Sequence, residues 1–263
     1  PPMLSINMLF GDLIRIKTFF EKRIIDILNI ENISYEILIA MNSSDIKKES
    51  FLSFIKEIKA HIKIIWTGVN NLPYARNLLA SHSKGNFILI WDDDCKILPG
   101  GVNYMLEKIQ SFPAGVVGLL SKSENGNIFK PASFELTFQC PEIFGDLLIV
   151  PRVGGMAFVT YKKILQKIPE FIFLALRGEW LEWYSRLWQH GIIPTHALSD
   201  KYYIIDQALP GMSATKRSDR LFHIFLYLLT ICYFYKISKK NYSWNRLRDL
   251  TLEENLPEED KIY

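Results

Sequence analysis

The chain has 263 residues, of which 49% are hydrophobic and 22% are charged, and its formal net charge at pH 7 is +3. This length suits one large domain, or one domain with an appendage, and the hydrophobic content excludes a disordered or fibrous protein. The small positive charge, without a basic stripe interleaved with aromatic residues, gives no reason to expect a nucleic-acid partner.

Hydrophobic patterning predicts alternating strands and helices in the first part of the chain. Short apolar runs predict strands at 3–10, 35–40, 62–66 and 87–91. Apolar residues at helical spacing predict intervening helices at 12–29, 48–60 and 74–83. Strands that alternate with helices in this way are typical of a mostly parallel sheet with helices on its faces.

The middle of the chain continues this pattern less regularly. We expect strands at 114–120, 147–150, 156–160 and 202–205, and helices at 99–111, 161–168 and 179–190. Residues 121–146 carry no clear period, and hairpins or a mobile loop both fit them. The helix at 179–190 is strongly aromatic, and its rings fall on more than one face, so a core helix is favoured over a pocket lining.

The C-terminal part differs in composition from the rest. Residues 221–237 are apolar and aromatic, and basic residues flank them. This length is marginal for a membrane-spanning helix and also suits an interfacial helix or one that packs on the main domain. We expect a domain at 1–212 and a helical segment with an acidic tail at 213–263.

Cysteine usage and the N-terminus suggest the compartment. The cysteines stand far apart without metal-ligand spacing, so reduced thiols are expected at Cys95, Cys140 and Cys232. The first residues lack the basic start and long apolar run of a signal peptide. We expect a cytoplasmic protein, with residues 221–240 as a candidate peripheral contact with the inner face of the plasma membrane.

Three adjacent carboxylates follow the apolar strand Phe87–Trp91, at Asp92, Asp93 and Asp94. Adjacent like charges repel each other, and ligands bind at the carboxyl ends of strands in open α/β sheets. A divalent cation held by Asp92 and Asp94, shared with substrate phosphates, explains this arrangement. A solvated acidic turn ahead of the next helix is the alternative.

Two stretches carry a resemblance to a known family. Tyr74-Ala75-Arg76-Asn77, followed by Lys84 to Asp94, is similar to a motif of family 2 glycosyltransferases at matching spacing. The resemblance covers about 3 to 235. It implies an α/β fold of the GT-A type, with a Rossmann-like, mixed, mostly parallel sheet flanked by helices and a C-terminal helical appendage.

The resemblance implies a donor site for a nucleoside-diphosphate sugar. Asp92 and Asp94 match the family's D-x-D motif, which holds Mn²⁺ or Mg²⁺ on the donor diphosphate, and Asp93 lies between them. Arg76 is expected near the donor, although a structural ion pair is its more common role. Met41 or Asn42 stands where the family has its usual acidic contact to the base, and Asn42 can still hydrogen-bond a base edge, which leaves the identity of the base open.

Three further positions complete the implied donor side. Phe10 either stacks on the base or is a core aromatic residue. Asp206 stands where the family often places a histidine, and it could complete the metal shell, with His196 as the alternative.

Further stretches resemble the acceptor side of the family. Val153–Phe158 matches a glycine-containing strand, so Gly154 and Gly155 are expected to let the substrate approach the backbone. Residues 177–187 resemble the helix start that carries the catalytic base. Trp180 replaces the family's aspartate there, so the base role falls to Glu179 or, less directly, to Glu182.

The resemblance implies an inverting, metal-dependent enzyme that moves a sugar from a donor, usually a UDP-sugar, to a hydroxyl of a glycan, glycoprotein or lipid-linked acceptor. Two other functions stay open. A nucleotidyltransferase would share the acidic metal site, but it would need a glycine-rich basic loop after the first strand. A non-catalytic sugar-nucleotide-binding partner of another transferase would account for Trp180.

Overall fold

The computed structural model describes residues 3–11, 16, 19, 27, 30–41, 62–69, 71–93, 95–112, 114–123, 143–150, 152–153, 157–170 and 179–206. At 123, 179–182, 185 and 206 it describes only the backbone. Ile16, Phe19 and Ile27 are helical and buried, as the helix predicted at 12–29 requires. The helix predicted at 48–60 and everything after 206 lie outside these ranges, so the domain boundary at 212 and the membrane contact stay predictions.

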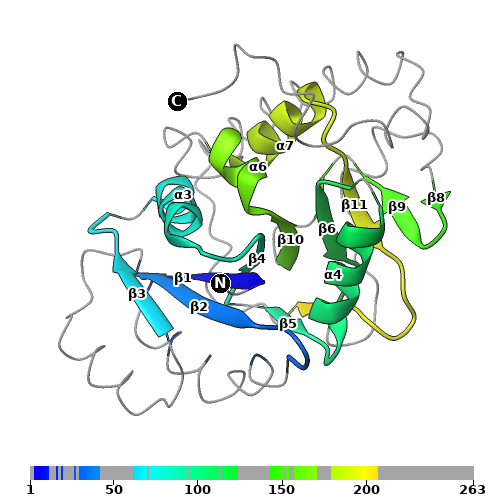
Figure 1. Cartoon of the computed structure of the whole chain (residues 1–263), viewed down its shortest axis with the longest axis horizontal. Coiled ribbons are helices and arrows are strands. Elements are labelled where there is room, and N and C mark those ends of the chain that lie inside the picture. The colour runs from blue at the N-terminus through cyan, green and yellow to red at the C-terminus, as the bar shows by residue number, and fades with distance from the viewer. Residues whose placement is uncertain are drawn as a thin grey trace.

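A parallel block of four strands forms the N-terminal half of the main sheet (Figure 1). Its spatial order is β3 (Ile62–Trp66), β2 (Tyr35–Met41), β1 (Leu4–Phe10) and β4 (Phe87–Trp91). Both β1 and β4 are buried along their whole length, which explains the continuous apolar sequence of β4. The two polar residues inside β1 are hydrogen-bonded, Ser5 to Glu36 and Asn7 to Ser83. Because the strands are parallel, their carboxyl ends lie at one edge of the sheet.

The other half of this sheet is mixed. Beyond β4 come β10 (Ala157–Tyr161), β6 (Val116–Leu119), β11 (Pro194–Ala197), β9 (Leu147–Ile149) and β8 (Ile143–Phe144). Only β6 and β11 pair in parallel here, and the other pairings are antiparallel. The predicted mixed α/β fold is therefore confirmed, but the predicted excess of parallel strands holds only in the N-terminal half.

Helices cover both faces of the sheet (Figure 1). On one face, α4 (Gly101–Ser111) buries an apolar stripe against the larger core cluster. On the other face lie α3 (Leu72–His82), α6 (Lys162–Lys167) and α7 (Glu179–Gln189). Among the described helices, none has the length and apolar character needed to cross a membrane.

A second, three-stranded sheet lies after the acidic triplet. It orders as β5 (Cys95–Ile97), β12 (Ile204–Asp206) and β7 (Ser121–Ser123), with β12 antiparallel to β5 and parallel to β7. Of these three strands, the sequence pattern predicted only β12, at 202–205, and β5 and β7 were missed. In the main sheet, β8 and β11 were missed as well.

A glycine fixes how the chain enters β4. The amide of Gly85 donates to Ser5 Oγ at 2.8 Å, and this hydroxyl donates to the Glu36 carboxylate at 2.6 Å. A Cβ atom at Gly85 would lie 2.6 Å from the Ser5 backbone nitrogen, so a larger residue would have to displace β1. This contact holds the start of β4, and therefore its acidic end, in register with β1 and β2.

Candidate active site

The acidic residues follow β4 in a short turn, and hydrogen bonds connect the residues at its two ends. The indole nitrogen of Trp91 donates to the carbonyl oxygen of Cys95 at 3.1 Å, and the Cys95 thiol lies 3.5 Å from the carbonyl oxygen of Asp92. Trp91 is buried and packs edge-on against Phe19. Asp92 and Asp93 are half-buried in this turn, and Asp94 lies outside the described residues.

The backbone of Asp206 lies beside this turn. In the antiparallel pairing of β12 with β5, Asp206 is directly opposite Cys95, which follows the acidic triplet. The Cα atoms of opposed residues in such a pair are about 4.5–5.5 Å apart. The topology therefore brings Asp206 next to the acidic turn although 112 positions separate it from Asp94 in sequence.

Carboxylate oxygens are the ligands that Mn²⁺ and Mg²⁺ prefer, so the residues gathered here fit such an ion chemically. Within the ranges that the structure describes, no three His, Cys, Asp or Glu side chains are grouped as a metal site. Asp94 and the side chain of Asp206 are outside those ranges, so both stay predicted ligands.

Phe10 belongs to the core and does not form a base-stacking surface. Its ring is fully buried at the end of β1 and packs edge-on against Phe19, with 5.5 Å between ring centroids. The alternative expectation for this residue, a core aromatic, therefore replaces its assignment to the donor. Asn42, the predicted contact to the base, lies one residue beyond β2 and outside the described residues.

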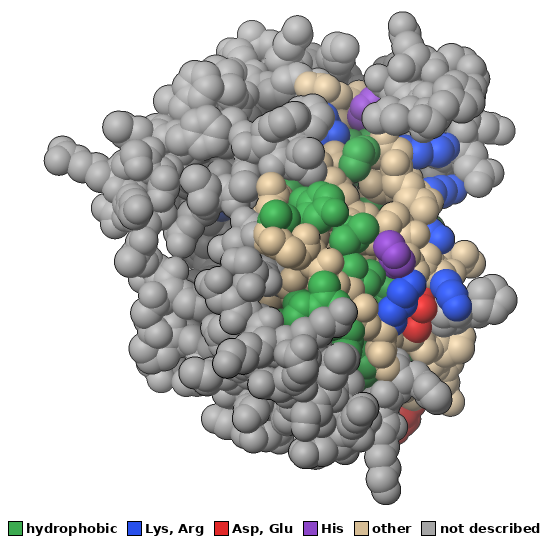
Figure 2. Space-filling view, turned by 90° about the vertical axis from the view of Figure 1, so that its left-hand side faces the viewer, with side chains coloured by type: hydrophobic (Ala, Val, Ile, Leu, Met, Phe, Trp, Pro, Cys, Tyr) green, Lys and Arg blue, Asp and Glu red, His purple; other side chains and the backbone are tan. Residues whose placement is uncertain are grey.

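The beginning of α3 is exposed at the edge of the sheet where the carboxyl ends of the parallel strands lie. Asn71 caps the helix by accepting a hydrogen bond from the Tyr74 amide at 2.9 Å. The side chains of Val69 and Tyr74, which flank this cap, are 49% and 38% exposed. Figure 2 shows the side of the molecule that bears β3 and α3, where hydrophobic side chains gather next to basic ones.

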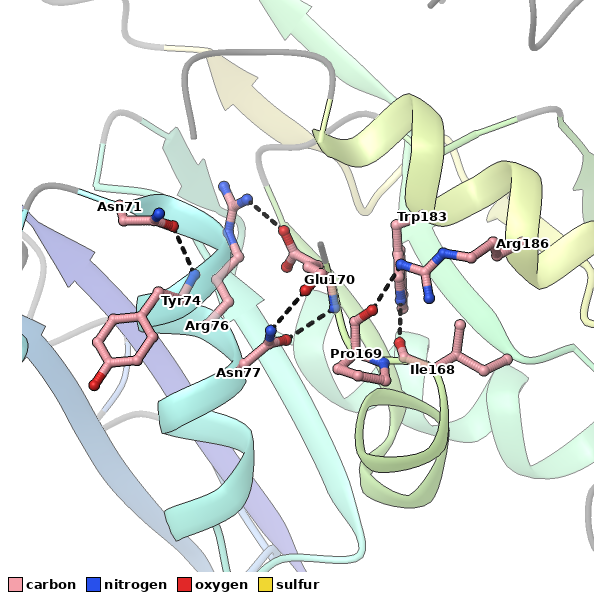
Figure 3. A network of polar contacts seen from close by, with 9 residues as sticks. All are labelled: Asn71, Tyr74, Arg76, Asn77, Ile168, Pro169, Glu170, Trp183 and Arg186. Atoms are coloured by element: carbon pink, nitrogen blue, oxygen red, sulfur yellow. Dashed lines mark hydrogen bonds and ion pairs between the residues drawn. The ribbon is translucent and has the colours of Figure 1, made fainter. Parts of the chain in front are cut away.

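Arg76 is a buried ion-pair partner in this structure, which is the more common role of such a residue, and its contact with the donor stays a prediction. It lies on the inner face of α3, is 3% exposed, and places Nη1 3.2 Å from the carboxylate of Glu170 (Figure 3). The adjacent Asn77 accepts a hydrogen bond from the Glu170 amide at 2.9 Å and donates to the Glu170 carbonyl at 2.7 Å. Arg76 and Asn77, which belong to the stretch that resembles the family motif, therefore bind a segment about 93 residues away in sequence.

The helix expected to carry the base, α7, is anchored to the same segment (Figure 3). The indole of Trp183 donates to the Ile168 carbonyl at 2.7 Å, and Arg186 donates to the Pro169 carbonyl at 2.6 Å. Trp183 is fully buried, and its ring stacks on Phe158 of β10.

The expectation of a core helix is confirmed for the described aromatic side chains of α7. Trp183, Tyr184 and Trp188 are all buried, and burial raises the pKa of the Tyr184 hydroxyl. Glu179, Trp180 and Glu182 occupy the first turn of α7, and the structure describes only their backbone.

On the acceptor side, Gly154 and Gly155 lie outside the described residues, between the buried Val153 and strand β10. A Cβ atom at Gly118 of β6 would lie 2.1 Å from Val153 Cγ1. The chain therefore packs directly on the sheet just before the two glycines.

His196, the alternative to Asp206, is buried within β11 and lies opposite Gly118 and Leu148 in the ladder. Burial lowers the pKa of its imidazole to about 4, so the ring is neutral at pH 7. A ring enclosed in the sheet does not reach donor phosphates, and Asp206 is the better placed of the two.

Residues 18–167, more than half of the chain, match the model of glycosyl transferase family 2. The chain belongs to this family. The resemblance in the two motif stretches is therefore confirmed. No curated protein matches the chain in sequence.

Solved structures share the fold of this family 2 chain. The crystal structure of S. aureus TarS 1-349 has a TM-score of 0.58 at 15% identity, covering 78% of this chain and 60% of that one. The crystal structure of GalNAc-T7 with UDP, GalNAc and Mn²⁺ has a TM-score of 0.60 at 14% identity, covering 94% and 54%. TarS 1-349 in complex with UDP-GlcNAc has a TM-score of 0.58 at 15% identity, covering 86% and 65%.

At these identities the likeness shows the fold alone, which is that of GT-A glycosyltransferases. The family 2 chain spans between 54% and 65% of the length of these three structures.

Two residues of this site were not found by sequence reasoning. Trp91 was interpreted only as the last apolar residue of a strand, although its position before the acidic triplet could have suggested a role in closing the turn. Glu170 carries no local signal, because its partners Arg76 and Asn77 come from another part of the chain.

Proposed function

We propose that this family 2 protein transfers a sugar from a nucleoside-diphosphate sugar, a UDP-sugar in the first instance, to a hydroxyl of a glycan, glycoprotein or lipid-linked acceptor. The observation that carries the proposal is the acidic turn after β4, which the Trp91 hydrogen bond closes and β12 flanks. Structures with this fold that contain UDP and Mn²⁺, or UDP-GlcNAc, support the donor class.

Asp92 and Asp94, with Asp206, would hold Mn²⁺ or Mg²⁺ at the carboxyl end of β4. A bound divalent cation supplies positive charge that stabilises the leaving nucleoside diphosphate. Asn42 would donate or accept a hydrogen bond at the edge of the base. Because Phe10 is in the core, the exposed ring of Tyr74 is the aromatic surface that we propose for contact with the base.

The acceptor hydroxyl needs a base, and we propose Glu179, at the first position of α7. Its carboxylate takes the proton as the hydroxyl oxygen attacks the anomeric carbon, and the bond to the diphosphate breaks on the opposite side, so the configuration inverts. Glu182, in the same turn, is the alternative base. Gly154, Gly155 and Trp180 are proposed to border the acceptor.

Donor binding is tested by thermal unfolding with a panel of nucleoside-diphosphate sugars, in Mn²⁺ and in chelator. A donor at about 100 times its Kd adds about 2.7 kcal/mol to the free energy of unfolding, which shifts Tm measurably. We expect a shift with one nucleotide class in Mn²⁺ only, and expect Asp92→Asn and Asp206→Asn to reduce it. A shift of equal size in chelator would contradict the metal site.

Transfer is tested separately, by release of the nucleoside diphosphate with candidate acceptors. Turnover with the donor that binds supports the enzyme. Mn²⁺-dependent binding without turnover for any acceptor would instead support a non-catalytic sugar-nucleotide-binding protein, the function that Trp180 in place of an aspartate suggests.

A further inference from the structure

Residues 168–170, which we call the junction, connect the end of α6 to the stretch that leads to α7. Pro169 has no amide hydrogen, and all five backbone polar groups of the junction are hydrogen-bonded. The Ile168 amide binds the Ile164 carbonyl within α6, and the four remaining groups bind side chains of α3 or α7. A segment without regular structure that satisfies all its backbone groups in this way is held firmly in place.

The side chain of Asn77 is suited to this task. Its amide group offers one acceptor and one donor, and it uses them on the N–H and the C=O of a single residue, Glu170. The neighbouring Arg76 adds an ion pair to the same residue, and both charged side chains are almost fully buried. Two consecutive residues of α3 therefore fix both the backbone and the side chain of Glu170.

Helix α7 holds the junction from the other side (Figure 3). Trp183 and Arg186 lie three positions apart, on adjacent turns of one helix face, and donate to consecutive carbonyl groups, those of Ile168 and Pro169. Two such bonds fix the rotation of α7 about its axis and its position along that axis. The hydrogen bonds from α3 and α7 end on different residues of the junction, so the junction transmits position between the helices.

We infer that Asn77 and Trp183 are positioning residues, which through the junction hold α7, and with it the first turn that contains Glu179, at a fixed place relative to α3. The inference rests on the proposed function for its catalytic part, because Glu179 is a proposed base. A reacting group displaced by about 1 Å can lose 10²-fold in rate, so the junction affects turnover more than binding of the donor.

The first test does not depend on activity. Asn77→Ala removes the two hydrogen bonds between the Asn77 side chain and the Glu170 backbone and leaves α7 unaltered, so we expect amide hydrogen exchange in the peptide 179–189 to accelerate about tenfold. The control is Ser81→Ala, which removes a hydrogen bond from Ser81 Oγ to the Leu78 carbonyl within α3. Unchanged exchange at 179–189 in Asn77→Ala would overturn the inference.

Should Asn77→Ala fail to fold, Trp183→Phe provides the reciprocal test. It loses one hydrogen bond to the junction and keeps a ring against Phe158. Coupling through the junction is reciprocal, so this change in α7 should accelerate exchange in the peptide 72–82 of α3. Exchange that changes only within α7 would overturn the inference.

The second test measures kcat and the donor KM separately. We expect Asn77→Ala and Trp183→Phe each to lower kcat about 10- to 100-fold with the donor KM within about twofold of wild type. The double variant should lose less than the product of the two single losses, because both act through one junction. Unchanged kcat in these variants, or an equal fall in kcat in Ser81→Ala, would mean that the junction contributes only to stability and does not position α7 for catalysis.

The two tests separate this inference from the proposed function. A wild-type protein that neither binds nor consumes a sugar nucleotide contradicts the function, and the exchange measurements still decide whether the junction couples the helices.

Discussion

The indole nitrogen of Trp91 donates a hydrogen bond to the carbonyl oxygen of Cys95 across 3.1 Å, and Asp92 and Asp93 lie in the turn that this bond closes. One end of the turn is the buried strand β4, and the other is β5, which pairs with β12 at Asp206. The carboxylates are thus held on a short loop between two sheets, and little conformational entropy is left for a bound cation to remove.

Trp91→Phe tests this arrangement. The change keeps an aromatic ring near Phe19 but removes the donor to the Cys95 carbonyl, so we expect a loss of about 1–3 kcal/mol in stability. A looser turn should also weaken metal-dependent donor binding about tenfold, as measured by Mn²⁺ titration at a fixed donor concentration.

The matched control is Trp183→Phe, which also loses a buried indole hydrogen bond, at 2.7 Å to Ile168, away from the acidic turn. A similar loss of stability with unchanged Mn²⁺ affinity is expected. Equal weakening of Mn²⁺ binding in both variants would show that general destabilisation, and not the turn, is responsible.

The parallel half of the fold could be predicted from the sequence because its signals are local and strong. The apolar runs of β1, β2, β3 and β4 are bounded by turn residues, and their predicted limits agree with the structure within one residue. The acidic turn could be predicted as well, because the end of an apolar run and the three aspartates that follow it are adjacent in sequence, and ligands bind at the carboxyl ends of such strands.

The rest of the sheet depends on contacts between distant residues. Strand β11 contains a proline, a threonine and a histidine, yet it lies buried between β6 and β9, where Thr195 binds the Val116 carbonyl at 3.2 Å. The three strands of the small sheet have three residues each, too short for a period, and pairing defines them. The ion-pair partner of Arg76 could not be predicted for the same reason, because Glu170 is 94 positions away.

The buried pair of Arg76 and Glu170 should contribute more to stability than a half-exposed pair. Arg76→Met leaves a buried carboxylate without its cation, which typically costs about 3–5 kcal/mol. The additional change Glu170→Gln removes that charge, so the double variant should be more stable than Arg76→Met alone. Urea denaturation measures both differences.

Lys108→Met is the comparison for this prediction. It breaks the pair with Asp146, whose atoms are 2.6 Å apart but whose carboxylate side chain is 39% exposed, so water can replace the lysine. The loss should be smaller than for Arg76→Met. Equal losses would mean that burial of the Arg76–Glu170 pair does not increase its contribution to the free energy of unfolding.

His196 should make the protein lose stability in mild acid. Burial lowers the pKa of its ring from 6.5 to about 4, so above pH 6.5 the ring is neutral in both the folded and the unfolded state. Between pH 6.5 and 4 the unfolded chain binds a proton that the folded protein excludes. The free energy of unfolding therefore falls as the pH falls through this window, by up to about 1.4 kcal/mol per pH unit.

His196→Leu should flatten the curve of unfolding free energy against pH in that window, as measured by urea denaturation at several pH values. Thr195→Val is the control, since it loses a hydrogen bond in the same strand without a titrating group. Thr195→Val should lower the free energy of unfolding by the same amount at every pH. An unchanged slope in His196→Leu would assign the acid sensitivity to other groups.

The position of α7 leads to a test that distinguishes its two carboxylates. Glu179 is the first residue of the helix, and Glu182 comes three positions later, before the Trp183 and Arg186 anchors. Glu179→Gln should lower transfer by about 10²–10⁴-fold while the donor-dependent Tm shift is kept, because a general base contributes this factor to the chemical step alone. Glu182→Gln is an isosteric change in the same turn and serves as its control. The opposite result, a loss only in Glu182→Gln, would assign the base to Glu182, and a loss of donor binding in Glu179→Gln would mean that this carboxylate acts on the donor side.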